Sequence, residues 1–278
     1  MRTGRYARGP VECHEAADVV VEQVEDREGL DAALRHGVQA AIAAPEHDEA
    51  WRAELSAAVA RGEFKFPRTV LPAVTHEDLR HWLDRLLLHQ PVQAELAREL
   101  RDDVLSLVRL QGVLARSAVF MVRLSTDAPS RRCGFHVDTV APRAPTIGLL
   151  RVYGGAGTDY VEPSNVLGSD DFYRDLSARE RLARELERAA VAGDEAAWEE
   201  ASRAIDQLDC RPRFLRDPPQ VKVAAAGTIV AFRHLDVRRH WSSHPMGLAW
   251  VHRSPMEGEP RVVVSVTARE PGALRAAR

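Results

Sequence analysis

Apolar residues recur at helical spacing over much of the first 115 residues. The spacing in residues 51–60 predicts an amphipathic helix. Thr75 is a typical N-cap for a second helix, and Pro91 is expected to open a third. Residues 18–22 are a β-branched run that predicts a short strand before these helices. The third helix has the longest apolar stripe, which consists of Leu96, Leu100, Val104, Leu107 and Val108.

The pattern changes after about residue 116, where short β-branched and aromatic runs replace the helical spacing. A charged, alanine-rich helical stretch interrupts these runs at about 170–210 and is divided by Gly193. We interpret this stretch either as a lid or as a solvated helical hairpin that only packs against the strands. The predicted strands are 117–124, 146–153, 221–224, 228–232, 247–252 and 261–268, with a tight turn at 154–158.

This order of elements predicts an α+β protein whose strands form a barrel or a double-sheet jelly roll. We expect residues 1–115 to be a mainly helical region that packs on the core. Residues 116–270 would form that core with its helical insertion, and residues 271–278 would be a frayed tail. A chain of 278 residues, 45% of them hydrophobic, is sufficient for one large domain.

Charge and cysteine content exclude several classes of protein. The 38 basic and 41 acidic residues nearly balance, so no general attraction to nucleic acid or to an anionic membrane is expected. No apolar run approaches the roughly 18 residues of a membrane span, and no signal peptide is recognisable. The scattered Cys13, Cys133 and Cys210 favour neither a disulfide framework nor a structural zinc site. A cytoplasmic location is the expectation.

The candidate chemistry centres on His136 and Asp138, at the end of a predicted strand. Residues i and i+2 of a strand point the same way about 7 Å apart, so both side chains can reach one cation. His252 is the expected third ligand, and His244 is the second choice. Two His and one carboxylate with open positions are typical of a non-haem Fe(II) oxygenase. Taken alone, a His-x-Asp pair on a strand is more often a simple hydrogen bond.

Other residues are candidates for the surroundings of this site. A turn between two strands is expected to return Arg261 close to His252, where its guanidinium would match a carboxylate. Taken alone, an arginine at the start of a strand is more often a surface charge. Tyr153 and Arg123 lie on strands expected to line the same core, where they would contact cofactor or substrate or serve the structure. The histidines of the basic, aromatic segment at 232–244 would form either a loop for an acidic substrate or a solvated loop: His234, His240 and His244.

Between about residues 119 and 268 the chain resembles the Fe(II)/2-oxoglutarate-dependent dioxygenase superfamily. More narrowly, it is similar to an uncharacterised bacterial family with Phe-His-x-Asp, Gly-x-Gly-Thr and His-Arg-Ser-Pro motifs, at 135–138, 155–158 and 252–255 here. The resemblance implies a double-stranded β-helix catalytic core of the jelly-roll or cupin kind. It implies that His136, Asp138 and His252 are catalytic and bind iron, and that Arg261 binds the distal carboxylate of 2-oxoglutarate.

The resemblance implies hydroxylation or a related oxidation of a small-molecule substrate by O₂. Related halogenases lack the carboxylate ligand, and Asp138 is present here. The chain departs from the superfamily in its long separation of Asp138 from His252 and in having Val263 where Ser or Thr is frequent. Two other classes stay open: a cupin-like metal- or ligand-binding protein without oxygenase activity, and a metal-dependent dioxygenase that uses no 2-oxoglutarate. The sequence sets no oligomeric state.

Overall fold

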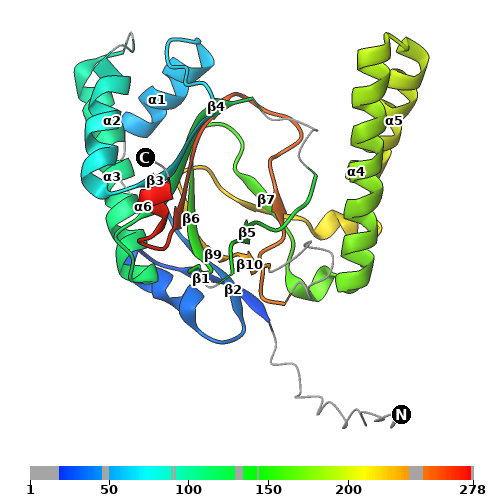
Figure 1. Cartoon of the computed structure of the whole chain (residues 1–278), viewed down its shortest axis with the longest axis horizontal. Coiled ribbons are helices and arrows are strands. Elements are labelled where there is room, and N and C mark those ends of the chain that lie inside the picture. Colours follow the sequence, from blue (N-terminus) through cyan, green and yellow to red (C-terminus); the bar gives the residue numbers. More distant parts are fainter. Residues whose placement is uncertain are drawn as a thin grey trace, which may run out of the picture.

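The fold is taken from a computed structural model that describes residues 19–45, 50–88, 90, 92–128, 134–142, 144–237 and 247–276. Two facing groups of strands lie at its centre, and helices cover them on both outer sides (Figure 1). Side chains of both groups share one apolar cluster, which includes Leu150 and Phe232 from one side and Tyr160 and Trp250 from the other. The molecule is therefore a mixed α and β protein with a two-sided β core.

The larger group is a mixed sheet of seven strands. The first two strands of the sheet are parallel to each other, and every other pair of neighbouring strands in it is antiparallel. The parallel pair is joined by a 3-10 helix, η1 (Glu28–Leu34). In spatial order the strands are β1 (Val20–Val24), β2 (Val38–Ala43), β9 (Ile229–Arg233), β6 (Ile147–Tyr153), β12 (Arg261–Ala268), β4 (Phe120–Asp127) and β3 (Thr69–Val74).

The smaller group carries the residues of most chemical interest. Three short antiparallel strands lie in the order β11 (His252–Arg253), β7 (Thr158–Tyr160) and β8 (Lys222–Ala224). A separate parallel pair is formed by β5 (Thr139–Val140) and β10 (Leu235–Asp236). Because β5 directly follows Asp138 and β11 begins at His252, these short strands determine where the candidate ligands lie.

Three helices cover the outer face of the seven-stranded sheet: α1 (Ala50–Ala60), α2 (His76–Leu88) and α3 (Ala94–Ala115). All five residues of the apolar stripe predicted for the third helix are buried there. Thr75 and Asp78 form a reciprocal cap at the start of α2, with the Thr75 hydroxyl accepting from the Asp78 amide at 3.1 Å. Local sequence signals thus determine where these helices begin and which face they bury.

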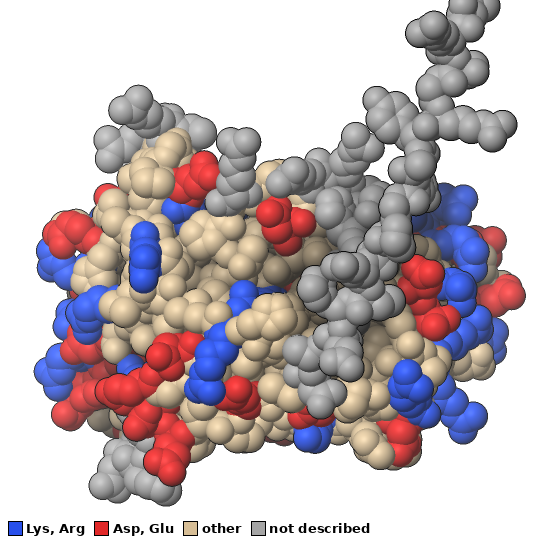
Figure 2. All heavy atoms as spheres, turned by 90° about the horizontal axis from the view of Figure 1, so that it is seen from below, with Lys and Arg blue, Asp and Glu red and all other residues tan. Residues whose placement is uncertain are grey.

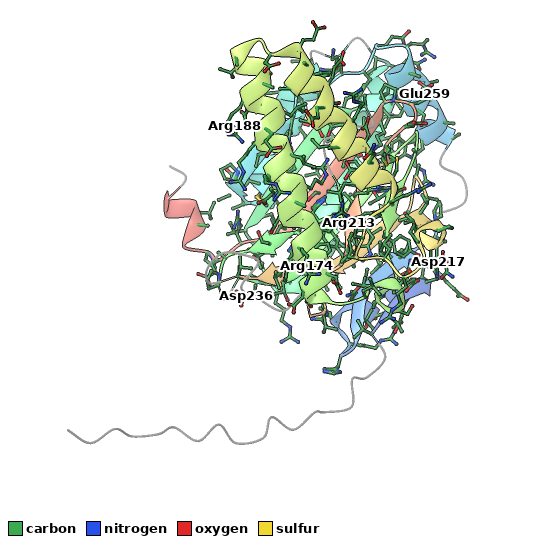
Figure 3. All side chains as sticks on the ribbon, turned by 90° about the vertical axis from the view of Figure 1, so that its right-hand side faces the viewer. Arg174, Arg188, Arg213, Asp217, Asp236 and Glu259 are labelled. Atoms are coloured by element: carbon green, nitrogen blue, oxygen red, sulfur yellow. The ribbon has the colours of Figure 1, made fainter. Side chains whose placement is uncertain are left out.

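A hairpin of two long helices, α4 (Ser169–Ala192) and α5 (Glu195–Cys210), lies on the opposite side of the strands (Figure 1). Gly193 ends α4 in a left-handed conformation at φ 67°, and the Asp194 side chain caps α5. Figure 3 shows this hairpin face-on, with Arg174 and Arg188 on α4 and Arg213 beside it. The base of the hairpin packs against the smaller sheet with the short 3-10 helices η2 (Pro163–Asn165) and η3 (Pro218–Gln220) nearby.

The structure differs from the sequence-based expectation in several elements. The mainly helical region expected at 1–115 contributes three strands to the large sheet, β1, β2 and β3. β2 is buried along its whole length, so it has lost the alternating pattern that identifies a half-exposed strand. The third helix starts at Ala94 rather than at Pro91, and the strand expected at 247–252 is reduced to β11. The expected frayed tail contains a short helix, α6 (Ala273–Ala276).

Charge is distributed without one dominant sign on the face shown in Figure 2. Acidic and basic side chains are intermixed over the described part of that face. This agrees with the formal net charge of only −3 for the whole chain. Among the described helices, none has the length and apolar character needed to cross a membrane.

Candidate metal centre

His136 and His252 lie directly opposite each other in an isolated antiparallel bridge. The amide of His136 donates to the carbonyl of His252 at 2.9 Å, and the amide of His252 donates back at 3.1 Å. In such a pair both side chains project from the same face, with Cα atoms about 5.5 Å apart. The centroids of the two imidazole rings are accordingly 4.6 Å apart. The bridge therefore brings together two histidines that are distant in the sequence.

Asp138 completes a three-residue cluster on this face. One potential ligand atom from each of His136, Asp138 and His252 lies within 4.8 Å of the other two. The Nε2 atom of His136 is 3.8 Å from Oδ1 of Asp138. Neighbouring ligand atoms of a first-row metal ion lie roughly 3 Å apart, given bonds of about 2.1 Å. Small side-chain rotations would therefore suffice to close these three groups around one ion.

Hydrogen bonds determine which nitrogen of each ring is free to bind a cation. Nδ1 of His136 lies 3.0 Å from the carbonyl of Gly134, and Nδ1 of His252 lies 3.1 Å from the carbonyl of Trp250. A carbonyl only accepts, so each Nδ1 must carry the proton. Each neutral ring then presents the lone pair of Nε2, the arrangement that second partners impose on metal-binding histidines.

The protonation states suit a divalent cation. Burial lowers the pKa of His252 to about 4, so its ring is neutral at pH 7. Burial acts to raise the pKa of Asp138, but the neighbouring imidazoles and the Arg123 guanidinium outweigh it and hold that pKa below its ordinary value. A neutral imidazole and an ionised carboxylate are the forms that bind metals.

Aromatic rings support His252 from one side. The indole of Trp250 stacks on its imidazole at 4.4 Å and 15°, and the ring of Phe232 lies 5.4 Å away. Trp250 is completely buried. Because the stacked indole restricts rotation of the imidazole, the orientation of Nε2 is set before any metal binds.

The residues around His136 and His252 contact a buried ion pair of the helical hairpin. Arg179 on α4 donates two hydrogen bonds to Asp209 on α5, at 2.8 and 2.9 Å. A Cβ atom on Gly134 would lie 2.2 Å from Nε of Arg179, so the strand can approach this pair only without a side chain there. Arg253 donates to the Asp209 carbonyl at 2.8 Å and covers the ring of Phe135 at 4.3 Å. The base of the hairpin is thus attached directly to the candidate site.

Arg261, at the start of β12, is buried close to His252. Its Nη2 atom donates to the hydroxyl of Ser254, two residues beyond His252, at 3.0 Å. Its Nη1 atom donates to the carbonyls of Ala156 and Gly157 in the Gly-x-Gly-Thr loop. Burial lowers the pKa of Arg261 to about 10, which leaves the guanidinium charged at pH 7. The Nε atom has no hydrogen-bond partner among the described residues, so this buried cation still has a donor to offer.

Arg123 and Tyr153 lie on opposite faces of the large sheet. Arg123 on β4 lies opposite Ser265 on β12, and Ser265 lies opposite Leu150 on β6, so these three side chains share one face of the sheet. Leu150 belongs to the apolar cluster between the two groups of strands. Its positive charge also acts on the pKa of Asp138. Tyr153 instead packs against Trp51 at 5.8 Å in the helix-side core, where its hydroxyl donates to Asp103.

The position of the Tyr153 side chain contradicts the sequence-based expectation that it contributes to the cofactor site. Strand alternation identifies the residues that share a face with Tyr153, but the packing of α1 and α3 decides that this face is the helix side. We therefore exclude Tyr153 from the candidate cofactor site. Arg261 and Arg123 remain candidates, because both lie on the face of the large sheet that is directed toward the smaller group of strands.

His234 is a neighbour of the site that sequence reasoning had assigned to a loop. Its side chain is buried, and its Nε2 atom lies 4.0 Å from Oδ2 of Asp138. The period-two continuation of β9 through Val230 and Phe232 was the signal that could have identified it as an inward-facing residue. His240 and His244, the other histidines of that segment, lie outside the described residues.

The chain belongs to the family described as "Protein of unknown function (DUF1826)", which matches residues 25–266. Comparison with curated proteins finds no match. Among solved structures, the chain is similar to the rice dioxygenase for auxin oxidation, with 10% identity, a TM-score of 0.40, and coverage of 90% of this chain and 83% of that one.

Two further solved structures show a similar low-identity likeness. The 2-oxoglutarate complex of dioxygenase for auxin oxidation 1 from Arabidopsis thaliana has 12% identity, a TM-score of 0.35, and coverage of 91% of this chain and 93% of that one. A Pseudomonas putida prolyl-4-hydroxylase has 13% identity, a TM-score of 0.30, and coverage of 82% and 98%.

Proposed function

We propose that this protein is a non-haem Fe(II)/2-oxoglutarate-dependent oxygenase that oxidises a small molecule, by hydroxylation or a related reaction. The observation that carries the proposal is the cluster of His136, Asp138 and His252, with Nε2 of each imidazole free to bind. The proposed core is a double-stranded β-helix, which is supported by the two groups of strands packed on a shared apolar cluster. The proposal includes O₂ as co-substrate and a cytoplasmic location.

The donor set fits Fe(II). Two neutral imidazoles and one carboxylate on one side of an octahedral ion leave the opposite positions open, and this pattern is typical of non-haem Fe(II) oxygenases. Bound Fe(II) with 2-oxoglutarate and O₂ would supply the oxidising power, with succinate and CO₂ as co-products. The residues of the chain would place the ion, orient the organic acid and limit access of water.

Arg261 fits the role of carboxylate partner. It is a buried guanidinium that keeps its charge at pH 7, and its fork of donors matches a carboxylate. Its bonds to Ala156, Gly157 and Ser254 fix the plane of the fork before a ligand arrives. Arg123 contributes a second positive charge on the same interior face. The apolar rings of Trp250 and Phe232 would limit water beside His252.

A metal-dependent enzyme or binding protein that uses no 2-oxoglutarate is the second candidate. The observation that favours it is that Arg261 already has three hydrogen-bond acceptors within the protein. An arginine that only ties the Gly-x-Gly-Thr loop to β11 would make the same contacts. Binding of 2-oxoglutarate to the metal-loaded protein separates the two candidates, because only the oxygenase requires it.

The test is succinate formation by anaerobically purified protein supplied with Fe(II), ascorbate, 2-oxoglutarate and O₂. We expect slow turnover in the wild type and its loss in the His136→Ala variant. His81→Ala is the matched control, because His81 is a half-exposed histidine on α2 whose Nε2 contacts Glu77 at 2.9 Å. Absence of succinate together with absence of 2-oxoglutarate binding in calorimetry would reject the oxygenase and leave the second candidate.

A further inference from the structure

His234 is a buried imidazole without a hydrogen-bond partner in the described part of the chain. Its side chain is 1% exposed, and no described residue places a donor or acceptor within hydrogen-bonding range of Nδ1 or Nε2. A buried polar group left in this state destabilises the fold, so its presence requires an explanation. A hydrophobic residue of similar size would avoid that cost in the metal-free fold.

The carboxylate of Asp138 lies close to the imidazole of His234. Nε2 of His234 is 4.0 Å from Oδ2, whereas Oδ1 of the same carboxylate faces Nε2 of His136 at 3.8 Å. Oδ1 of Asp138 is thus directed toward the ligand cluster, and Oδ2 is directed toward His234. A small rotation of the carboxylate would bring Oδ2 within hydrogen-bonding distance.

The backbone holds these two residues in register. The amide of Leu235 donates to the carbonyl of Asp138 at 2.8 Å, and Leu235 pairs with Thr139 between the parallel strands β10 and β5. The amide of His234 donates to the carbonyl of Thr146 at 2.7 Å. His234 immediately precedes β10, and Asp138 immediately precedes β5. Because these two strands are paired, main-chain hydrogen bonds rather than side-chain contacts set the separation of His234 from Asp138.

The surrounding residues leave room for this ring and for little else. A Cβ atom on Gly148 would lie 2.5 Å from both Cε1 and Nε2 of His234. On another side the ring of Phe232 meets the imidazole edge-on at 4.8 Å. Among the described residues, the cluster of potential ligand atoms that lie close to one another consists of His136, Asp138 and His252. His234 is not part of this cluster.

We propose that His234 is a positioning residue for the metal centre, whose Nε2–H donates to Oδ2 of Asp138 and so directs Oδ1 alone to the cation. This inference rests on the proposed function, because it assumes that the cluster binds a metal ion. Outer partners of metal ligands fix ligand orientation, and their removal typically weakens metal binding about 10- to 100-fold. The imidazole thereby gains the hydrogen bond that it lacks in the described protein.

The experiment compares His234→Leu, His234→Gln and His234→Asn with the wild type, using Co(II) as the probe in isothermal titration calorimetry. The glutamine amide can reach the position of Nε2 and should stay within about tenfold of wild-type affinity. The asparagine amide is too short to reach it, and leucine has no donor, so both should bind Co(II) about 10- to 100-fold more weakly. Because glutamine and asparagine differ only in reach, their comparison remains decisive even if the leucine variant does not fold.

A second readout separates positioning from a merely structural role. Urea unfolding of the metal-free proteins should find His234→Leu at least as stable as the wild type, since leucine removes two buried unpartnered nitrogens. Wild-type Co(II) affinity in both the leucine and asparagine variants would overturn the inference and leave the metal site intact. Complete loss of binding in the glutamine variant would overturn it too, by making His234 a ligand. A folded wild type that binds no Co(II) would instead reject the metal centre itself.

Discussion

His136 and His252 exchange backbone hydrogen bonds at 2.9 and 3.1 Å, so the candidate site is built across an antiparallel bridge rather than along one strand. The bridge fixes the two imidazoles on one face at a ring-centroid distance of 4.6 Å. Asp138 joins them because it lies two residues beyond His136 on the same strand end. The geometry therefore depends on main-chain pairing.

Replacement of His252 with alanine should abolish Fe(II) or Co(II) binding, measured by calorimetry under anaerobic conditions. The loss should exceed the roughly 100-fold that removal of an outer partner produces, because a ligand atom itself is removed. His81→Ala should bind as the wild type does. If the metal is retained in His252→Ala and is lost in His244→Ala, the ligand assignment is wrong.

Replacement of Arg261 with lysine should raise the KM for 2-oxoglutarate and leave metal affinity unchanged. Lysine keeps the positive charge but lacks the two-pronged donor arrangement. A hydrogen bond to a charged group contributes about 1.5–3 kcal/mol, so losing one corresponds to roughly tenfold or more in affinity. Arg184→Lys, at an exposed position on α4, is the control. An unchanged KM would support the candidate enzyme that uses no 2-oxoglutarate.

Replacement of Tyr153 with phenylalanine should destabilise the fold without affecting 2-oxoglutarate binding. The Tyr153 hydroxyl donates to the buried carboxylate of Asp103, and losing a hydrogen bond to a charged group costs about 2 kcal/mol. Urea unfolding gives the stability change, and calorimetry gives the ligand affinity. Tyr160→Phe is a milder control, since within the described residues its hydroxyl accepts a long hydrogen bond from Gln23, at 3.4 Å. A weakened 2-oxoglutarate affinity would contradict the placement of Tyr153 on the helix side.

Replacement of Gly148 with alanine should perturb the metal site through His234. The added Cβ would lie 2.5 Å from two atoms of the imidazole, so the ring must shift from its position opposite Asp138. We expect weaker Co(II) binding and a loss of about 1–3 kcal/mol in the free energy of unfolding, the usual cost of overpacking. Gly272→Ala is the matched control, because no atom of the described residues lies within 4 Å of a Cβ built there. Equal behaviour of the two variants would contradict the contact.

The stability of the metal-free protein should fall as the pH is lowered below 6.5. Burial lowers the pKa of His234 to about 4 from an ordinary value of 6.5. Between these values the unfolded chain binds a proton that the folded protein does not, so acid favours unfolding. The contribution of His234 is present above pH 6.5, and about 2 kcal/mol of it should be lost between about pH 7 and pH 5.

Urea unfolding at several pH values measures this dependence. The His234→Leu variant should lose less stability on acidification than the wild type, because it lacks one of the groups that titrate on unfolding. Part of the dependence should remain, since the pKa of His252 is lowered to about 4 in the same way. Identical pH profiles for the variant and the wild type would show that His234 is not buried in its neutral form.

Local patterns in the sequence were sufficient to predict several helices and strands and the shared face of two candidate ligands. The stripe from Leu96 to Val108 predicted the buried face of α3, because helix periodicity needs no information from other segments. The Arg261–Ala268 strand was predicted with its observed bounds. The spacing of His136 and Asp138 predicted that both side chains share one face, since strand alternation is a local property.

Tertiary structure decided the rest, because it depends on which segments meet. β2 is buried on both faces, so its sequence shows no alternation from which a strand could be identified. The side on which Tyr153 lies follows from the helices that pack on the sheet. The approach of His234 to Asp138 follows from the parallel pairing of β10 with β5, two segments whose register no local pattern encodes.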